Sequence, residues 1–182
     1  MPAEAVIQGM RMEMEKMYGQ ICALSAHLED LRVRTALIIK KTEKGEKSFD
    51  YNFEGDFTAL RNNMRLMNAK ANDFYHFSER AMKMFRMAPS LQNSINMARS
   101  LFVVTRHFRL ELEKLAAIQS AARPLFRKIP ITIYWWELDK VVDELYKVSG
   151  LMLNLNKNIL ALAGGDLPPQ DSTEESTEAP QP

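Results

Sequence analysis

The sequence has little of several residue types, and each shortage argues against a class of protein. Cys22 is the only cysteine in 182 residues, so no internal disulfide can form, and a reducing, cytoplasmic location is expected. Glycine occurs 7 times, which disfavours a β-rich fold and a glycine-built phosphate loop. No apolar run approaches the ~18 residues that cross a bilayer. The N-terminal residues also lack the basic and apolar segments of a secretion signal.

Motifs for catalysis and metal binding are also missing. GxxxxGK[ST], GxGxxG, GxSxG, HExxH and paired CxxC do not occur in the chain. The nearest approach to a metal-binding helix is His76 before Glu79, and His107 before Glu111. His76 falls opposite the apolar stripe of its segment, and Glu111 is more typical of a polar core position that fixes register. We therefore expect no catalytic residue, no metal and no cofactor.

The chain does contain apolar residues spaced alternately three and four apart, and this is its main signal. Such spacing keeps one apolar stripe on a gently supercoiled helix. Four stripes predict an all-α fold, an elongated antiparallel up-down four-helix bundle with coiled-coil-like heptad packing. The stripes are Ile7, Met10, Met14, Met17, Ile21, Leu24, Leu28, Leu31, Thr35 and Ile38; Phe57, Leu60, Met64, Met67, Ala71, Phe74, Ser78, Ala81 and Phe85; Leu101, Val104, Phe108, Glu111, Leu115, Ile118, Ala122 and Leu125; and Ile131, Tyr134, Leu138, Val141, Leu145, Val148, Met152, Leu155, Ile159 and Leu162.

Polar and glycine- or proline-containing segments separate the stripes. They place the bundle at residues 1–163, with helices at about 3–40, 54–87, 90–124 and 131–163. The last two connections are short, which predicts that the helices they join are antiparallel neighbours. Residues 164–182 contain five acids, no base and little apolar surface, so a disordered tail is expected. It is either a solvating terminus or a charge mask for a neighbouring copy.

The stretch IPITIYWWELDK, residues 129–140, differs from the rest in its β-branched residues and adjacent tryptophans. Ile131 already obeys the fourth stripe, and proline suits a first helical turn, so we interpret the segment as the start of a helix. Trp136 then lies almost opposite the stripe and needs a cover. Two covers remain open: the first linker folding over it with Phe49, Tyr51 and Phe53, or a binding partner.

Basic residues gather at the same predicted end of the bundle. Basic residues interleaved with aromatics are typical of single-stranded nucleic-acid sites, where phosphates pair and bases stack. The interspersed acids weaken this reading, and a plain soluble helix end is the simpler one. The candidate partner-binding or nucleic-acid-binding residues are Arg32, Arg34, Lys40, Lys41, Lys44, Lys47, Tyr51, Arg61, Arg123, Arg127, Lys128, Trp135 and Trp136.

The function expected from these features is a non-enzymatic scaffold or adaptor that self-associates and binds a protein partner. Extra apolar residues on the flanks of the second and fourth helices favour a homo-oligomer, because one four-helix core does not need them. The alternative is an accessory subunit of a nucleoprotein complex that binds RNA or DNA through the basic, aromatic end.

Overall fold

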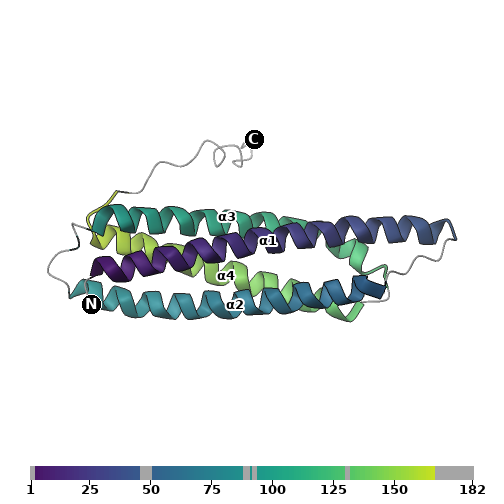
Figure 1. The fold of residues 1–182 in the computed structure, drawn as a ribbon, viewed down its shortest axis with the longest axis horizontal. Coiled ribbons are helices and arrows are strands. Elements are labelled where there is room, and N and C mark those ends of the chain that lie inside the picture. Colours follow the sequence, from purple (N-terminus) through teal and green to yellow (C-terminus); the bar gives the residue numbers. More distant parts are fainter. Residues whose placement is uncertain (1–2, 46–50, 88–90, 92–93, 130–131, 167–182) are drawn as a thin grey trace, which may run out of the picture.

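The computed structural model describes residues 3–45, 51–87, 91, 94–129 and 132–166, and within these ranges the chain forms four α-helices (Figure 1). They are α1 (Ala3–Glu43), α2 (Tyr51–Arg86), α3 (Ile95–Phe126) and α4 (Thr132–Leu162). The described ranges contain no strand, which confirms the all-α fold class. None of these helices combines the length and apolar character needed to cross a membrane. The tail beyond Asp166 lies outside the described residues.

Successive helices run in opposite directions, as predicted for an up-down bundle (Figure 1). They do not follow chain order around the core, however. α1 packs against α2 and α3, and α4 also packs against α2 and α3, so α2 and α3 lie diagonally opposite each other. The prediction that α2 and α3 are neighbours is therefore wrong. A connection over 87–94 reaches about 26 Å when extended, which is ample for the ~14 Å diagonal of a bundle with ~10 Å between adjacent axes.

The start of α4 agrees with the interpretation of the tryptophan segment as a helix start. Residues from Thr132 onward are helical, while Ile131 lies outside the described residues. The same helix ends where glycines were expected to stop it. Gly164 has a φ of 80°, a left-handed conformation that glycine adopts without a Cβ penalty.

α1 is the longest helix, with 41 residues against 31 in α4. The difference corresponds to about 15 Å at 1.5 Å per residue. In Figure 1 the C-terminal end of α1 extends past the ends of the other helices. Leu37, near this end, is 52% exposed, so the extension is not fully covered by the described part of the bundle.

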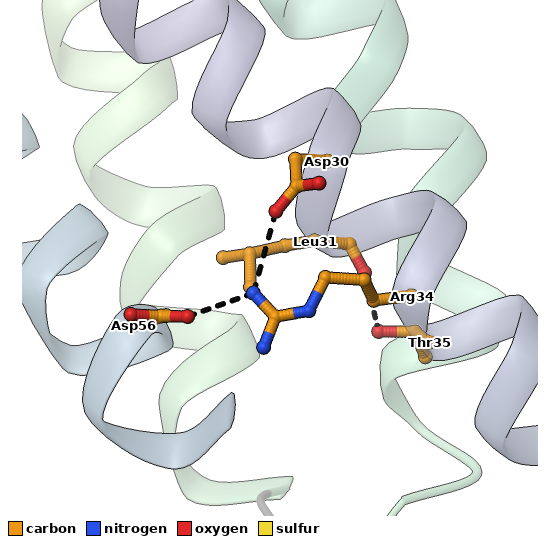
Figure 2. Close-up of polar contacts among 5 residues, drawn as sticks. All are labelled: Asp30, Leu31, Arg34, Thr35 and Asp56. Carbon is orange, nitrogen blue, oxygen red and sulfur yellow. Dashed lines mark hydrogen bonds and ion pairs between the residues drawn. The ribbon is translucent and has the colours of Figure 1, made fainter. Parts of the chain in front are cut away.

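The predicted stripes of α1 and α2 form the core on their side of the bundle. All the stripe residues are buried except Ile38, which is half-buried. The polar members are satisfied within their own helices: Thr35 donates to the Leu31 carbonyl at 2.7 Å (Figure 2), and Ser78 donates to the Phe74 carbonyl at 2.8 Å. These two stripes are confirmed.

The predicted stripe of α3 is only half right. Every second member is buried as expected, but the intervening core positions are one residue later than predicted. The buried residues are Leu101, Thr105, Phe108, Leu112, Leu115, Gln119, Ala122 and Phe126, whereas Val104, Glu111, Ile118 and Leu125 are half-buried. A core position for Glu111 would have cost the desolvation of a carboxylate.

The stripe of α4 shifts in the same way toward its C-terminal end. Asn156 and Ala163 are buried in place of the predicted Leu155 and Leu162. The shift brings two polar side chains together in the core, because Asn156 Nδ2 donates to Thr105 Oγ1 at 2.7 Å. Thr105 in turn donates to the Leu101 carbonyl. The core of α3 and α4 therefore contains a polar contact that apolar spacing did not predict.

Candidate protein-interaction surface

The predicted basic site lies at the end where α1 and α3 finish and α2 and α4 begin (Figure 1). Its arginines are largely occupied by carboxylates. Arg34 Nη1 lies 2.7 Å from Asp56 Oδ2 on α2 and 3.3 Å from Asp30 Oδ2 on its own helix (Figure 2). The hydrogen bond to Asp56 raises the pKa of Arg34. The guanidinium also lies over the Phe53 ring, at 5.4 Å from its centroid.

Two further carboxylates bind arginines between neighbouring helices. Glu137 of α4 accepts from Arg61 at 3.0 Å and from Arg65 at 3.1 Å, both on α2. Asp139 of α4 accepts from Arg123 of α3 at 2.9 Å, and this contact raises the pKa of Arg123. Together with the Arg34 pair, these contacts join α1 to α2, α2 to α4 and α3 to α4. Their main role at this end of the bundle is to hold helices together.

A smaller group of cations at this end has no ion pair with a described residue. Lys40, Lys41 and Lys44 are exposed on and just beyond the extension of α1, and Lys128 is exposed after α3. Arg127 stacks over the Trp135 ring at 4.5 Å from its centroid. The remaining candidate residues add no further unpaired cation to the described part of this end. Arg32 pairs with Glu29 on its own helix, and Lys47 and the Tyr51 side chain lie outside the described residues.

Trp136 keeps half of its surface exposed, at 50%. Of the three linker aromatics expected to cover it, only Phe53 has a described side chain, and it lies in the first turns of α2. Phe53 is buried against Phe57, with ring centroids 6.4 Å apart. Phe49 lies outside the described residues. Trp136 is therefore still available to a partner within the described part of the fold.

A groove with a mostly apolar lining lies between α1 and α2. One part, with a volume of about 570 Å³, lies near the N-terminus of α1. A second part, of about 230 Å³, lies further along the same two helices. Lys70 lines both parts, and its Nζ donates to Gln20 Oε1 across the groove at 3.3 Å. The first part is lined by Ala5, Val6, Gly9, Met10, Glu13, Lys70, Asp73, Phe74 and Phe77, and the second by Gln20, Ala23, Leu24, Asn63, Leu66, Met67 and Lys70.

The groove exists because the two helices present side chains of different size. The α1 wall carries short residues outside its core stripe, including Ala5, Gly9 and Ala23, and a Cβ added at Gly9 would meet nothing within 4 Å. The α2 wall carries large residues that remain exposed, Leu66 at 61% and Phe77 at 43%. Exposed apolar side chains grouped along a recess are typical of interaction sites.

Sequence reasoning found half of this surface. The apolar flank of α2 was predicted, but the facing wall of α1 was not, because its small residues add little to an apolar count. Their spacing was the available signal: Gly9, Gln20 and Ala23 each lie one residue before a core-stripe position.

One cluster of chemically reactive side chains lies between α1 and α3. Tyr18 packs against His107, with ring centroids 6.1 Å apart, and its hydrogen bond with the half-buried Cys22 raises the pKa of the phenol. A raised pKa leaves even less of the phenol in the basic phenolate form at neutral pH than in an ordinary tyrosine. No group of three potential metal ligands occurs among the described residues.

In comparisons with known proteins, no family model, no curated protein and no solved structure matches this chain. The class of protein is therefore defined by its fold and surface alone. It is an up-down four-helix bundle with diagonal α2–α3 order, an ion-paired end and an open apolar groove between α1 and α2.

Proposed function

We propose that the protein is a non-enzymatic scaffold or adaptor that self-associates and binds protein through the α1–α2 groove. The observation that supports this most directly is the groove itself, with Phe77 and Leu66 exposed beside a wall of small residues. Covering large apolar side chains is the main source of stability in protein–protein contacts. The free Cys22 is consistent with a cytoplasmic setting, which belongs to the same proposal.

Sedimentation velocity over a range of about 1–100 μM protein tests self-association, because an interface of this type is expected to populate dimers in the micromolar range. The monomer mass is 20.9 kDa. We expect a larger mass that falls on dilution. A monomer at every concentration would contradict the self-association half of the proposal.

A pair of substitutions then tests which face is used. Phe77→Glu places a charge in the groove and should abolish the dimer. Leu151→Glu is the matched control, since Leu151 on α4 is exposed to a similar extent, at 49%, but does not line the groove. If Leu151→Glu is the disruptive change, the α4 flank mediates association and the groove does not.

Binding of RNA or DNA is the second candidate function, favoured by the lysines on the α1 extension that lack a described carboxylate partner. Changing Lys40, Lys41, Arg127 and Lys128 to Glu should abolish retention of single-stranded RNA, and wild-type binding should weaken steeply with salt. Lys157→Glu, an exposed change on α4 toward the other end, is the control. Equal retention by the fourfold variant and the control would exclude this function for the basic end.

A further inference from the structure

We infer that the occupant of the α1–α2 groove is the same face of a second copy, packed antiparallel about a two-fold axis through the middle of the groove. This inference rests on the proposed self-association and specifies its geometry. A two-fold interface uses one surface patch on both subunits, so the patch must be complementary to itself. The groove meets this requirement in its shape, its charge and its size.

The lining residues locate the axis. On α1 the groove runs from Ala5 to Leu24, so its midpoint falls between residues 14 and 15. On α2 it runs from Asn63 to Phe77, and its midpoint is Lys70, which lines both parts. An antiparallel two-fold at this level places Gly9 of one copy opposite Gln20 of the other. The exposed Phe77 of each copy then faces the recess near the opposite end of its partner's groove.

Charge at the rim selects the antiparallel arrangement. Glu13 lines the groove, and Lys16 is an exposed residue three positions further along α1; neither has an ion pair within the described part of its own chain. Antiparallel pairing about the groove midpoint places Glu13 of each copy opposite Lys16 of the other, whereas parallel pairing places like charges together. On α2 the same axis places Lys70, which donates to Gln20 of its own chain, next to Lys70 of the other copy, so the favourable charge pairing comes from α1 alone.

The size of the face agrees with a weak dimer. The groove is about 30 Å long at 1.5 Å per residue, and two helices are ~20 Å wide. Each copy would therefore cover about 600 Å², or ~1,200 Å² in total, which is at the lower end of stable interfaces. Partial dissociation in the micromolar range is the expected behaviour.

Site-specific disulfide formation tests the register. Gly9→Cys and Gln20→Cys are prepared separately, each with Cys22→Ser, and are mixed under mild oxidation. The two positions are about 16 Å apart along one helix, and a disulfide requires Cα atoms within ~7 Å, so a bond between them must join two chains. We expect a cross-linked dimer from the mixture and much less from either variant alone. Cross-linking by each variant alone would indicate parallel packing and overturn the inference.

Charge exchange provides an independent readout. Glu13→Lys and Lys16→Glu should each raise the dimer dissociation constant about tenfold, because each change creates two like-charge contacts per dimer. The double variant exchanges the charges and should return the constant to within about threefold of wild type. Lys157→Glu, away from the groove, should leave it unchanged. Additive weakening in the double variant would overturn the predicted pairing.

These results separate the inference from the proposed function. A wild-type dimer that Phe77→Glu disrupts, but that gives neither the mixed disulfide nor the charge rescue, supports self-association through the groove and refutes the antiparallel two-fold. A wild-type monomer throughout the concentration range refutes both. Groove binding to a helix from an unrelated protein, with a monomeric wild type, would assign the groove to a different occupant and also overturn the inference.

Discussion

Replacing Thr105 with valine removes a single oxygen from the core and should be costly, because that oxygen has two roles. It donates to the Leu101 carbonyl and accepts from Asn156 Nδ2 at 2.7 Å, and both side chains are fully buried. In Thr105→Val the Asn156 amide keeps its place without an acceptor. An unsatisfied buried donor costs about 1–3 kcal/mol, so the free energy of unfolding should fall by about 2 kcal/mol.

A double variant replaces both hydrogen-bond partners with apolar residues. Thr105→Val combined with Asn156→Leu removes the donor along with the acceptor, so its stability should return to within about 1 kcal/mol of wild type. Thr35→Val is the matched control: Thr35 is equally buried and donates to a carbonyl in the same way, but accepts no side-chain hydrogen bond among the described residues. It should cost less than about 1 kcal/mol.

Urea unfolding followed by far-UV circular dichroism, at one fixed protein concentration, measures all four proteins. The reasoning would be refuted if Thr105→Val and Thr35→Val were equally destabilising. A double variant no more stable than Thr105→Val would refute it as well, because the coupling between the two side chains would then be absent.

Two further predictions concern a close approach between helices and the effect of pH. A Cβ at Gly150 would lie 2.5 Å from Arg109 Nη1, which is held by the Tyr146 carbonyl, so Gly150→Ala should not give the stabilisation of about 0.5–1 kcal/mol that an open helical glycine gives. Gly19→Ala, where the Cβ meets nothing within 4 Å, should give it, and thermal denaturation compares the two. The second prediction concerns Glu29, whose pKa is lowered by its hydrogen bond with Arg32. The stabilisation from this pair is therefore present above the usual glutamate pKa and is lost as pH falls through the lowered pKa. The stability difference between wild type and Glu29→Gln should therefore shrink as pH falls below the ordinary glutamate pKa and vanish below the lowered one, and a difference that persists in strong acid would show that the pair is not its cause.

The sequence predicted the stripes of α1 and α2 correctly because one unbroken three-and-four spacing describes the buried positions of each helix. In α3 the choice was ambiguous, since apolar Val104 and Ile118 stand beside polar Thr105 and Gln119. The polar residues in the core bond to another helix: Asn156 donates to Thr105, and Gln119 Nε2 donates to Asp139 at 2.9 Å, although Gln119 Oε1 is buried without a hydrogen-bond partner. The spacing of apolar residues within one helix does not show which polar residues will find a hydrogen-bond partner on another helix.

The same limit applies to helix order and to the candidate site. Alternating direction follows from connection length, but which helices become neighbours depends on packing between all four. Counting cations located the basic end, yet the carboxylates that occupy Arg34 and Arg61 lie 22 and 76 residues away in the chain. The α1–α2 groove required both walls to be known, and only the large residues of α2 were conspicuous in the sequence.

The diagonal order of the helices also fixes how each tip of the rod is polarised. α1 and α3 are neighbours pointing the same way, and so are α2 and α4. Each helix is a dipole with about half a unit of positive charge at its N-terminus and the opposite at its C-terminus. The tip where α1 and α3 begin therefore has two positive poles side by side and two negative poles facing them, which makes a transverse dipole. A negatively charged group approaching that tip along the bundle axis is drawn toward the side of α1 and α3, and two such tips that meet end to end attract only when the positive side of one faces the negative side of the other.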